Sequence, residues 1–254
     1  MKTVLVIVPF PMTPENLDLR RAQLDAVELG PGIRFDYRPV RAAPRNYVSA
    51  SDMVLADIGV LEAGLQAEAE GYDAVCVDTM SDSGVAALRS ELSIPVIGPG
   101  RTSVLTAMMV ASRFSIVALW PHWRHLYDKT LSDLGVGHAC ASVRALDLTP
   151  DNQSLLAGKE EDVFPALEAV SRRCIAEDGA EVILLGSTTM HAAHAHLAER
   201  LPVPVVNPGP LTYKLAEAAL CLGLTHSRAA YPVSPAPQLE KLRAMLDAGE
   251  AQGH

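Results

Sequence analysis

The sequence lacks the features of several large protein classes. Its longest apolar runs, such as 3–11 and 114–120, are far too short to span a bilayer. No secretory leader with a cleavage site follows Met1, so we expect a cytoplasmic protein. Lysine and arginine form no cluster and the formal net charge is −9, so nucleic acid would be repelled on average. Neither a membrane nor a nucleic acid is therefore an expected partner.

Cysteine is scarce and dispersed. The four cysteines, Cys76, Cys140, Cys174 and Cys221, form no Cys-x-x-Cys pair of the kind that zinc and redox sites use. In a reducing compartment we expect them to be small, buried apolar side chains. The chain also lacks the Walker and dinucleotide fingerprints, since Gly186 stands alone in its turn, so we expect no nucleotide cofactor.

The sequence does contain a repeat. Residues 73–100 read as a buried strand, a polar turn, a helix and a second short strand, and residues 181–209 repeat this order. Both copies end in a Pro-Gly pair, at 99–100 and 208–209, which we take as candidate crossing points between two halves. Two such copies predict two similar α/β halves that can hold a ligand between them.

Short apolar runs bounded by turn residues predict parallel strands covered on both faces. The runs are 3–8, 33–38, 73–79, 94–97, 114–119, 138–143, 182–187 and 203–206. Helical patterns alternate with them, at 53–70, 83–92, 103–111, 123–134, 160–178, 190–200 and 211–222. The predicted fold is α/β, with two pseudo-symmetric Rossmann-like halves, about four parallel strands in each, and the active site in the cleft between them. We assign residues 1–100 and 210–254 to the first half and 101–209 to the second.

Polar turns follow the carboxyl ends of four predicted strands, where open α/β sheets bind ligands. Two of these turns, 79–84 and 187–191, carry several hydroxyl groups and precede a helix. Their hydroxyls, backbone N–H groups and helix dipoles predict a site for a carboxylate or a developing enolate. Plain helix capping is the alternative for either turn. The residues expected to hold the anion are Thr79, Ser81, Asp82, Ser187, Thr188 and Thr189.

Two titratable residues lie beside these turns. His191 falls in the first turn of the second helix and is a candidate general acid or base near neutral pH. Asp78 ends an apolar strand, so it is either a general base with a raised pKa or the partner of a turn N–H group. Four more residues are expected to line the substrate: Phe10, Met12, Trp120 and His122.

The histidines also raise a metal hypothesis. His191 and His194 share a helix face, and His122 and His125 are likewise three residues apart. Such a pair can supply two ligands for a metal-assisted hydrolase or lyase. Solvated helix surface is the simpler explanation, and we expect no metal at the site.

Several stretches resemble the aspartate/glutamate/hydantoin racemase superfamily, and most closely its hydantoin and allantoin racemase branch. They are ELSIPVIGPG (91–100), RFSIVAL (113–119), ASVRALDL (141–148), EVILLGS (181–187), PVVNPG (204–209) and KLAEAAL (214–220). The resemblance implies two pseudo-symmetric α/β halves, an active site without metal or organic cofactor, a small-molecule substrate and a homo-oligomer.

The resemblance also implies a two-base reaction, in which one cysteine removes the proton from the substrate Cα and another returns it. Those cysteines would fall at Thr79 and Ser187, and Cys76 lies three residues early. A thiol titrates near pH 8.5, at about the value of a free cysteine, whereas a hydroxyl is a far weaker acid and needs an adjacent base.

We therefore expect chemistry other than two-cysteine racemisation. The reaction would be proton transfer, elimination or decarboxylation through an enolate-like intermediate, on a small carboxylate or cyclic ureide. His191 or Asp78 would move the proton, with Thr79 and Ser187 beside the reacting carbon. A protein that binds a small carboxylate without turnover is the alternative from another functional class.

Overall fold

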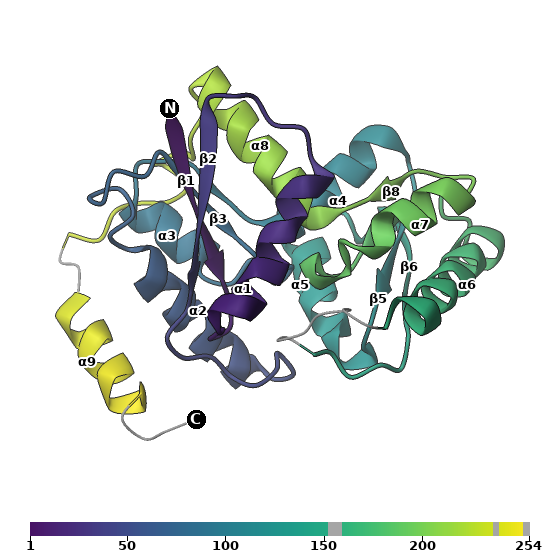
Figure 1. Cartoon of the computed structure of the whole chain (residues 1–254), viewed down its shortest axis with the longest axis horizontal. Helices are drawn as coiled ribbons and strands as arrows, with labels where there is room; N and C mark the ends of the chain where they lie inside the picture. Colours follow the sequence, from purple (N-terminus) through teal and green to yellow (C-terminus); the bar gives the residue numbers. More distant parts are fainter. Residues whose placement is uncertain (152–158, 236–238, 251–254) are drawn as a thin grey trace. The chain divides into compact units, whose positions relative to one another are not determined.

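The structure is a computed structural model that describes residues 1–151, 159–235 and 239–250 (Figure 1). Contacts between residues divide the chain into two compact units. The first unit contains Met1–Leu17, Glu28–Gly98 and Tyr213–His254, and the second contains Asp18–Val27 and Pro99–Thr212. Among the described residues, no helix is long and apolar enough to cross a membrane.

A four-stranded parallel sheet forms the centre of the first unit. Its order is β2-β1-β3-β4, with β1 at Lys2–Val8, β2 at Ile33–Pro39, β3 at Ala74–Val77 and β4 at Val96–Ile97. The helices of this unit are α2 (Ala50–Gly64), α3 (Val85–Glu91), α9 (Leu239–Glu250) and most of α8 (Pro208–Leu222).

Helices cover both faces of this sheet because its side chains alternate between two apolar surfaces. On one face, Ile7 and Val77 share a core with Val60 of α2 and Leu88 of α3. On the other face, Val6 pairs with Tyr37 and with Cys76. Tyr213 of α8 packs there, with its ring 6.3 Å from that of Tyr37.

The second unit repeats the same strand order. Its sheet runs β6-β5-β7-β8, with β5 at Phe114–Ala118, β6 at Cys140–Ala145, β7 at Val182–Leu185 and β8 at Val205–Val206. The helices are α4 (Pro99–Val110), α5 (Arg124–Leu134), α6 (Glu160–Asp178) and α7 (Ala193–Arg200), with short 3₁₀ turns η1 (Ala22–Ala26), η2 (Pro121–Trp123), η3 (Gly137–Ala139) and η4 (Thr188–Met190). All pairings in both sheets are parallel.

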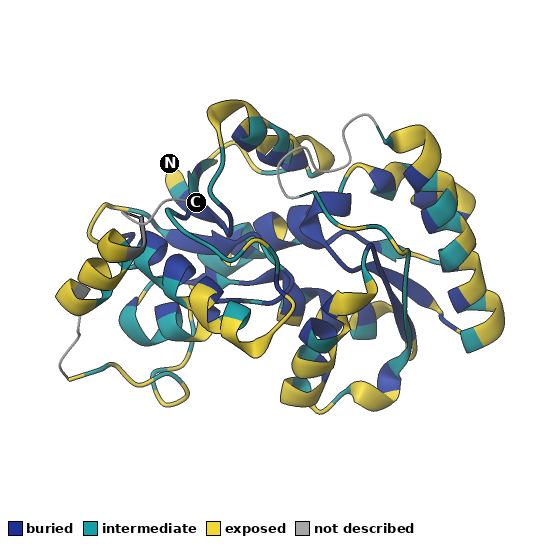
Figure 2. Cartoon of the chain, turned by 90° about the horizontal axis from the view of Figure 1, so that it is seen from below, coloured by how far each residue is buried: buried dark blue, intermediate teal, exposed yellow. Residues whose placement is uncertain are grey.

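The predicted α/β fold of two four-stranded parallel sheets is confirmed. All eight predicted strands exist, with ends that differ by at most two residues. The central strands β1, β3, β5 and β7 are almost entirely buried, the edge strands β2 and β6 are mostly half-buried, and the outer sides of the helices are exposed (Figure 2). Apolar runs of this kind arise because a parallel sheet covered by helices has no solvated face.

Several helix boundaries differ from the prediction. Helix α2 ends at Gly64, and turns occupy the following residues up to 70, which we had predicted to be helical. Helices α4 and α8 begin at Pro99 and Pro208, so the Pro-Gly pairs are the first turns of helices and not connecting loops. Proline suits the first helical position because its missing N–H would have no partner there.

Helix α1 (Pro14–Arg21) is absent from the predicted elements. It begins after Thr13, whose side-chain oxygen accepts a hydrogen bond from the N–H of Asn16 at 3.3 Å. A threonine cap followed by proline is a helix-start signal, and it stands before a polar segment with no apolar stripe. The sequence therefore offered a start signal without the periodicity that usually supports it.

The segment that follows α1 also corrects our domain assignment, which placed residues 1–100 together. Asp18–Val27 groups with the second unit. Two contacts explain this: Arg20 hydrogen-bonds Thr188, 168 residues away, and the buried Gln23 packs against Gly209. After Val27 the chain returns to the first unit, which contains Glu28–Gly98.

Gly209 is required by the approach of Gln23. A Cβ at position 209 would lie 1.7 Å from the Oε1 of Gln23. The Gln23 amide would have to move within a packed interior, so we expect Gly209→Ala to lower the free energy of unfolding by about 1–3 kcal/mol. The matched control is Gly137→Ala, because a Cβ at Gly137 meets nothing within 4 Å. Urea unfolding would measure both, and equal midpoints for the two variants would contradict the prediction.

Candidate active site

The turn after β3 presents a chain of hydroxyl groups. The side-chain oxygens of Thr79 and Ser81 are 3.0 Å apart, and those of Ser81 and Ser83 are 2.8 Å apart. Ser81 and Ser83 are buried and Thr79 is half-buried. Two hydrogen bonds among three hydroxyls consume two of their three protons, so the chain retains one proton to donate.

Backbone geometry holds this turn in place. Asp82 has a φ of 52°, in the left-handed region, and Gly84 has a φ of 70°. A glycine adopts that conformation without the strain of a Cβ, and the Gly84 N–H donates to the Asp57 carboxylate at 2.8 Å. The side chain of Asp82 packs against Gly98, so the predicted anion-binding role of Asp82 stays a prediction.

The turn after β7 repeats the hydroxyl pair. Ser187 caps η4, and its Oγ accepts a hydrogen bond from the Thr189 N–H at 3.2 Å. The Oγ of Ser187 and the Oγ1 of Thr189 are 2.9 Å apart. Thr188 lies between them, and its Oγ1 accepts a hydrogen bond from Arg20 at 3.3 Å. In both units, then, two hydroxyl groups that are two residues apart bond to each other. They lie just beyond β3 in the first unit and β7 in the second, which hold the same position in the strand order.

His191 directly follows this second turn. It ends η4, and α7 begins only at Ala193, so His191 precedes the helix in which we predicted it. The pKa of His191 is lowered to about 4, first by burial and second by the positive charge of Arg20, while a hydrogen bond to the Leu19 backbone opposes the shift. The imidazole is therefore neutral at neutral pH and can accept a proton.

The low pKa of His191 has a consequence for stability. Its pKa is depressed on folding, so the unfolded chain binds more protons between pH 6.5 and about 4. We expect the free energy of unfolding to fall as pH drops through this window, by up to about 2–3 kcal/mol. His191→Asn should remove that part of the pH dependence. Urea unfolding at pH 7, 5 and 4 tests this, and parallel pH profiles for both proteins would contradict it.

Asp78 occupies the end of β3 on the sheet face that α8 covers. It is 4% exposed, and its N–H donates to the Ile7 carbonyl at 2.9 Å. Its negative charge contributes to the raised pKa values of Cys76 and Tyr213, although burial is the larger cause for both. A buried carboxylate in this position is a candidate base, and it lies among groups that stay protonated.

The predicted apolar residues fall into two groups. In the first unit, Phe10 is buried and stacks on Tyr47 with ring centroids 5.0 Å apart, and the Tyr47 hydroxyl donates to the Pro9 carbonyl at 3.1 Å. Met12 beside them is half-buried. Tyr47 was not among the predicted residues, because no sequence pattern links it to a turn 38 residues away.

In the second unit, Trp120 lies at the carboxyl end of β5. The His122 ring meets it edge-on at a centroid distance of 4.6 Å, and Trp123 lies 6.4 Å away. Trp120 is half-buried and His122 is exposed. The pair thus offers an aromatic surface, and its role in lining the substrate stays a prediction.

The second histidine of the predicted metal pair, His194, and the nearby His196 have other partners. The His194 Nε2 hydrogen-bonds the Val205 carbonyl at 3.1 Å, and the His196 Nε2 hydrogen-bonds Glu168 at 3.1 Å. Within residues 1–151, 159–235 and 239–250, no three His, Cys, Asp or Glu side chains form a group that could hold a metal ion. The metal hypothesis gains no ligand set from this part of the chain.

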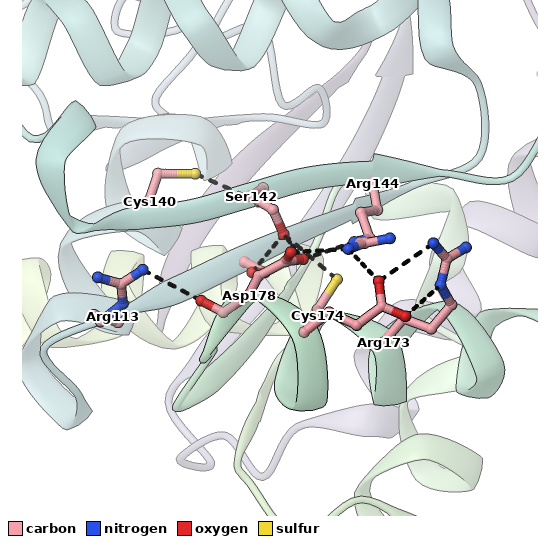
Figure 3. Close-up of polar contacts among 9 residues, drawn as sticks. Arg113, Cys140, Ser142, Arg144, Arg173, Cys174 and Asp178 are labelled. Atoms are coloured by element: carbon pink, nitrogen blue, oxygen red, sulfur yellow. Dashed lines mark hydrogen bonds and ion pairs between the residues drawn. The ribbon is translucent and has the colours of Figure 1, made fainter.

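The cysteines lie away from both turns. Cys76 is fully buried in β3, and burial raises its pKa strongly. In Figure 3, Cys140 and Cys174 lie on either side of Ser142, whose hydroxyl donates to the Asp178 carboxylate at 2.6 Å and lies 3.8 Å from the Cys174 Sγ. Burial raises the pKa of Cys140 to about 11 and also raises that of Cys174. These three thiols are poor nucleophiles at neutral pH.

Cys221 contradicts the expectation of four buried cysteines, because it is exposed. It lies in the last turn of α8, on a side that also exposes Leu222. Cys140 is half-buried, and the expectation is confirmed for Cys76 and Cys174.

A hollow of about 460 Å³ occurs elsewhere in the second unit, between α5 and the start of β6. Its charged lining residues, Arg124 and Asp128, pair with each other at 3.4 Å. Its other lining residues come from the rest of α5, the turn after it and Cys140–Val143 of β6, so neither hydroxyl turn contributes to this hollow.

The sequence comparison decides the family. The family described as Asp/Glu/Hydantoin racemase matches residues 20–216. The chain belongs to the Asp/Glu/hydantoin racemase family. Both hydroxyl turns and His191 fall within the matched region.

The curated relatives of this racemase-family protein include two hydantoin racemases. That of Rhizobium meliloti is 32% identical over 199 residues, which cover 74% of this chain and 78% of that protein. That of Pseudomonas sp. (strain NS671) is 30% identical over 188 residues, which cover 74% of each. These relatives assign the chain to the isomerase class of enzymes.

The solved structures agree with this assignment. Allantoin racemase from Klebsiella pneumoniae has a TM-score of 0.85 at 27% identity, with 95% of this chain and 99% of that chain covered. Allantoin racemase from Pseudomonas fluorescens has a TM-score of 0.82 at 26% identity, with 93% and 98% covered. Unliganded arylmalonate decarboxylase, at 21% identity and a TM-score of 0.59, shares the fold.

Proposed function

We propose that this racemase-family protein is a cofactor-independent isomerase that moves the proton on the carbon beside a carbonyl group. The favoured substrate class is a cyclic ureide, such as a 5-substituted hydantoin or allantoin, and the second is a small carboxylate. The relatives' names support the ureide. The observation that carries the proposal is the hydroxyl pair repeated at equivalent turns, Thr79 with Ser81 and Ser187 with Thr189.

Such turns suit the charge that this reaction develops. Removing the proton turns the neighbouring carbonyl into an enolate, whose negative oxygen gains from fixed hydrogen-bond donors. The hydroxyls of both turns are largely buried, so they are held in place before the reaction. His191, neutral at neutral pH, is the proposed proton acceptor, and Asp78 is the second candidate. A solvent water would return the proton to either face of the enolate.

We further propose that the proton moves without a pair of cysteines. Thr79 and Ser187 occupy the two positions where the family resemblance implies thiols. The thiols of Cys76, Cys140 and Cys174 all have raised pKa values, so they supply little thiolate near pH 7. Cys76→Ala tests this directly, because a protein that loses all activity with this change would depend on a thiol.

Solvent exchange tests the function itself. An enantiopure 5-substituted hydantoin and (S)-allantoin would be incubated with the protein in D₂O at pH 7. Proton NMR would follow the loss of the C5–H signal, and polarimetry would follow chirality. We expect both to change faster than in matched buffer without protein, since free ureides also racemise slowly.

The remaining outcomes separate the alternatives. Saturable binding without exchange would identify a binding protein and contradict catalysis. Release of CO₂ from a malonate, or an elimination product, would identify a lyase that uses the same enolate. Loss of activity with a chelator, restored by a metal, would identify the metal-assisted reaction.

A further inference from the structure

Arg20 is a charged side chain inside the second unit. It is 1% exposed and is among the largest fully buried side chains of the protein. Moving a guanidinium out of water is costly, so a buried arginine needs compensating contacts. One is visible at the candidate site, where the Arg20 Nη1 donates to the Thr188 Oγ1 at 3.3 Å. The charge therefore lies beside the hydroxyl turn of the second unit.

The same piece of α1 also reaches His191. The backbone of Leu19 hydrogen-bonds the imidazole, and the adjacent Arg20 charge disfavours its protonated form. Two further hydrogen bonds involve the backbone of His191 and uncharged partners. The backbone N–H of His191 donates to the Thr188 carbonyl at 3.3 Å, and the Asn207 side-chain amide donates to the His191 carbonyl at 3.4 Å. Among the described residues, Arg20 is the charged group that the structure shows acting on this imidazole.

We propose that Arg20 is a positioning residue of the candidate site, which fixes the Thr188 hydroxyl and holds a positive charge at the turn that leads to His191. Its role in catalysis rests on the proposed function, in which His191 carries the proton. A neutral imidazole can accept a proton from the substrate carbon, whereas an imidazolium can only donate. Arginine suits this task because it stays charged at every working pH, so its effect on His191 does not switch off.

The segment Asp18–Val27 belongs to the second unit, although the residues on both sides of it in the sequence belong to the first. Asp18–Val27 is the one part of the first hundred residues, apart from Pro99 and Gly100, that groups with the second unit. Gln23, further along, is fully buried against Gly209 and anchors the segment there. Because this segment packs in the second unit, the guanidinium of Arg20 reaches the turn that contains Thr188.

Nitrogen NMR of the imidazole rings tests the proposal without any substrate. Long-range ¹H–¹⁵N spectra would follow the histidines of the free protein from pH 3.5 to 8, and His191→Asn would assign the His191 signals among the eight histidines. In Arg20→Gln we expect His191 to titrate about one pH unit higher than in the wild type. In Arg20→Lys, which keeps the charge, we expect a smaller shift.

The matched control is Arg21→Gln. Arg21 is the next residue of the same helix, is exposed and pairs with Asp18. Removing its charge should leave the His191 titration unchanged, because exposed charges are screened by solvent. Equal titration of His191 in the wild type and Arg20→Gln would overturn the proposal.

A second variant covers the case in which Arg20→Gln does not fold. Thr188→Val removes the acceptor that fixes the guanidinium and retains the charge in the chain. We expect a shift of the His191 titration in this variant too, and an unchanged titration would count against Arg20 as a positioning residue. A shifted titration in a protein without ureide exchange would uphold the role of Arg20 and contradict the proposed function.

Discussion

Replacing Thr79 and Ser187 together by cysteine is expected to raise the rate of C5 proton exchange on an enantiopure hydantoin by about 10²-fold. The estimate is the lower end of what a positioned acid or base contributes, about 10²–10⁴-fold. Thiols at these positions would have a pKa near 8.5, about four units above that of His191, and so would be stronger bases. Each hydroxyl already has a hydroxyl neighbour, Ser81 or Thr189, that can hydrogen-bond a thiolate.

The single variants Thr79→Cys and Ser187→Cys are the matched controls. One thiol removes the proton and returns it mainly on its own face, whereas a pair of thiols can also return it on the other face without depending on water. We therefore expect each single variant to increase deuterium exchange more than loss of optical rotation, and the double variant to increase both. A folded double variant with the wild-type rate would mean that these positions are not at the reacting carbon.

The sequence predicts the sheets well because their signals are local. Runs such as 3–8 and 182–187 are continuously apolar, which a strand covered on both faces requires. The repeat within 73–100 and 181–209 likewise predicts equal strand order in the two units. The hydroxyl turns were predicted for the same reason, since the residues of each pair are only two apart.

The missed parts of the site depend on contacts that are distant in sequence. Arg20 meets Thr188 across 168 residues, and Tyr47 meets Pro9 across 38. Neither residue has a local pattern that marks it, since Arg20 reads as the polar end of a short helix. The partner of His194 is also distant in sequence, since its ring hydrogen-bonds the Val205 carbonyl 11 residues away.

Replacing His191 by asparagine is expected to lower the exchange rate on a confirmed ureide substrate by about 10²–10³-fold, the usual loss when a positioned acid or base is removed. Asparagine keeps a polar side chain near Leu19 and cannot accept a proton. The wild-type rate should fall at low pH with an apparent pKa near the value of about 4 set by burial and Arg20. Initial rates between pH 4 and 8 would measure both effects.

The matched control for this variant is His194→Asn, three residues further on. His194 hydrogen-bonds the Val205 carbonyl and takes no part in the proposed reaction, so its replacement should change the rate by far less than that of His191. Asp78→Asn decides between the two candidate bases. If His191→Asn retains the wild-type rate while Asp78→Asn loses it, the buried carboxylate at the end of β3 carries the proton. If both variants retain it, neither group does, and the proposed proton transfer is wrong.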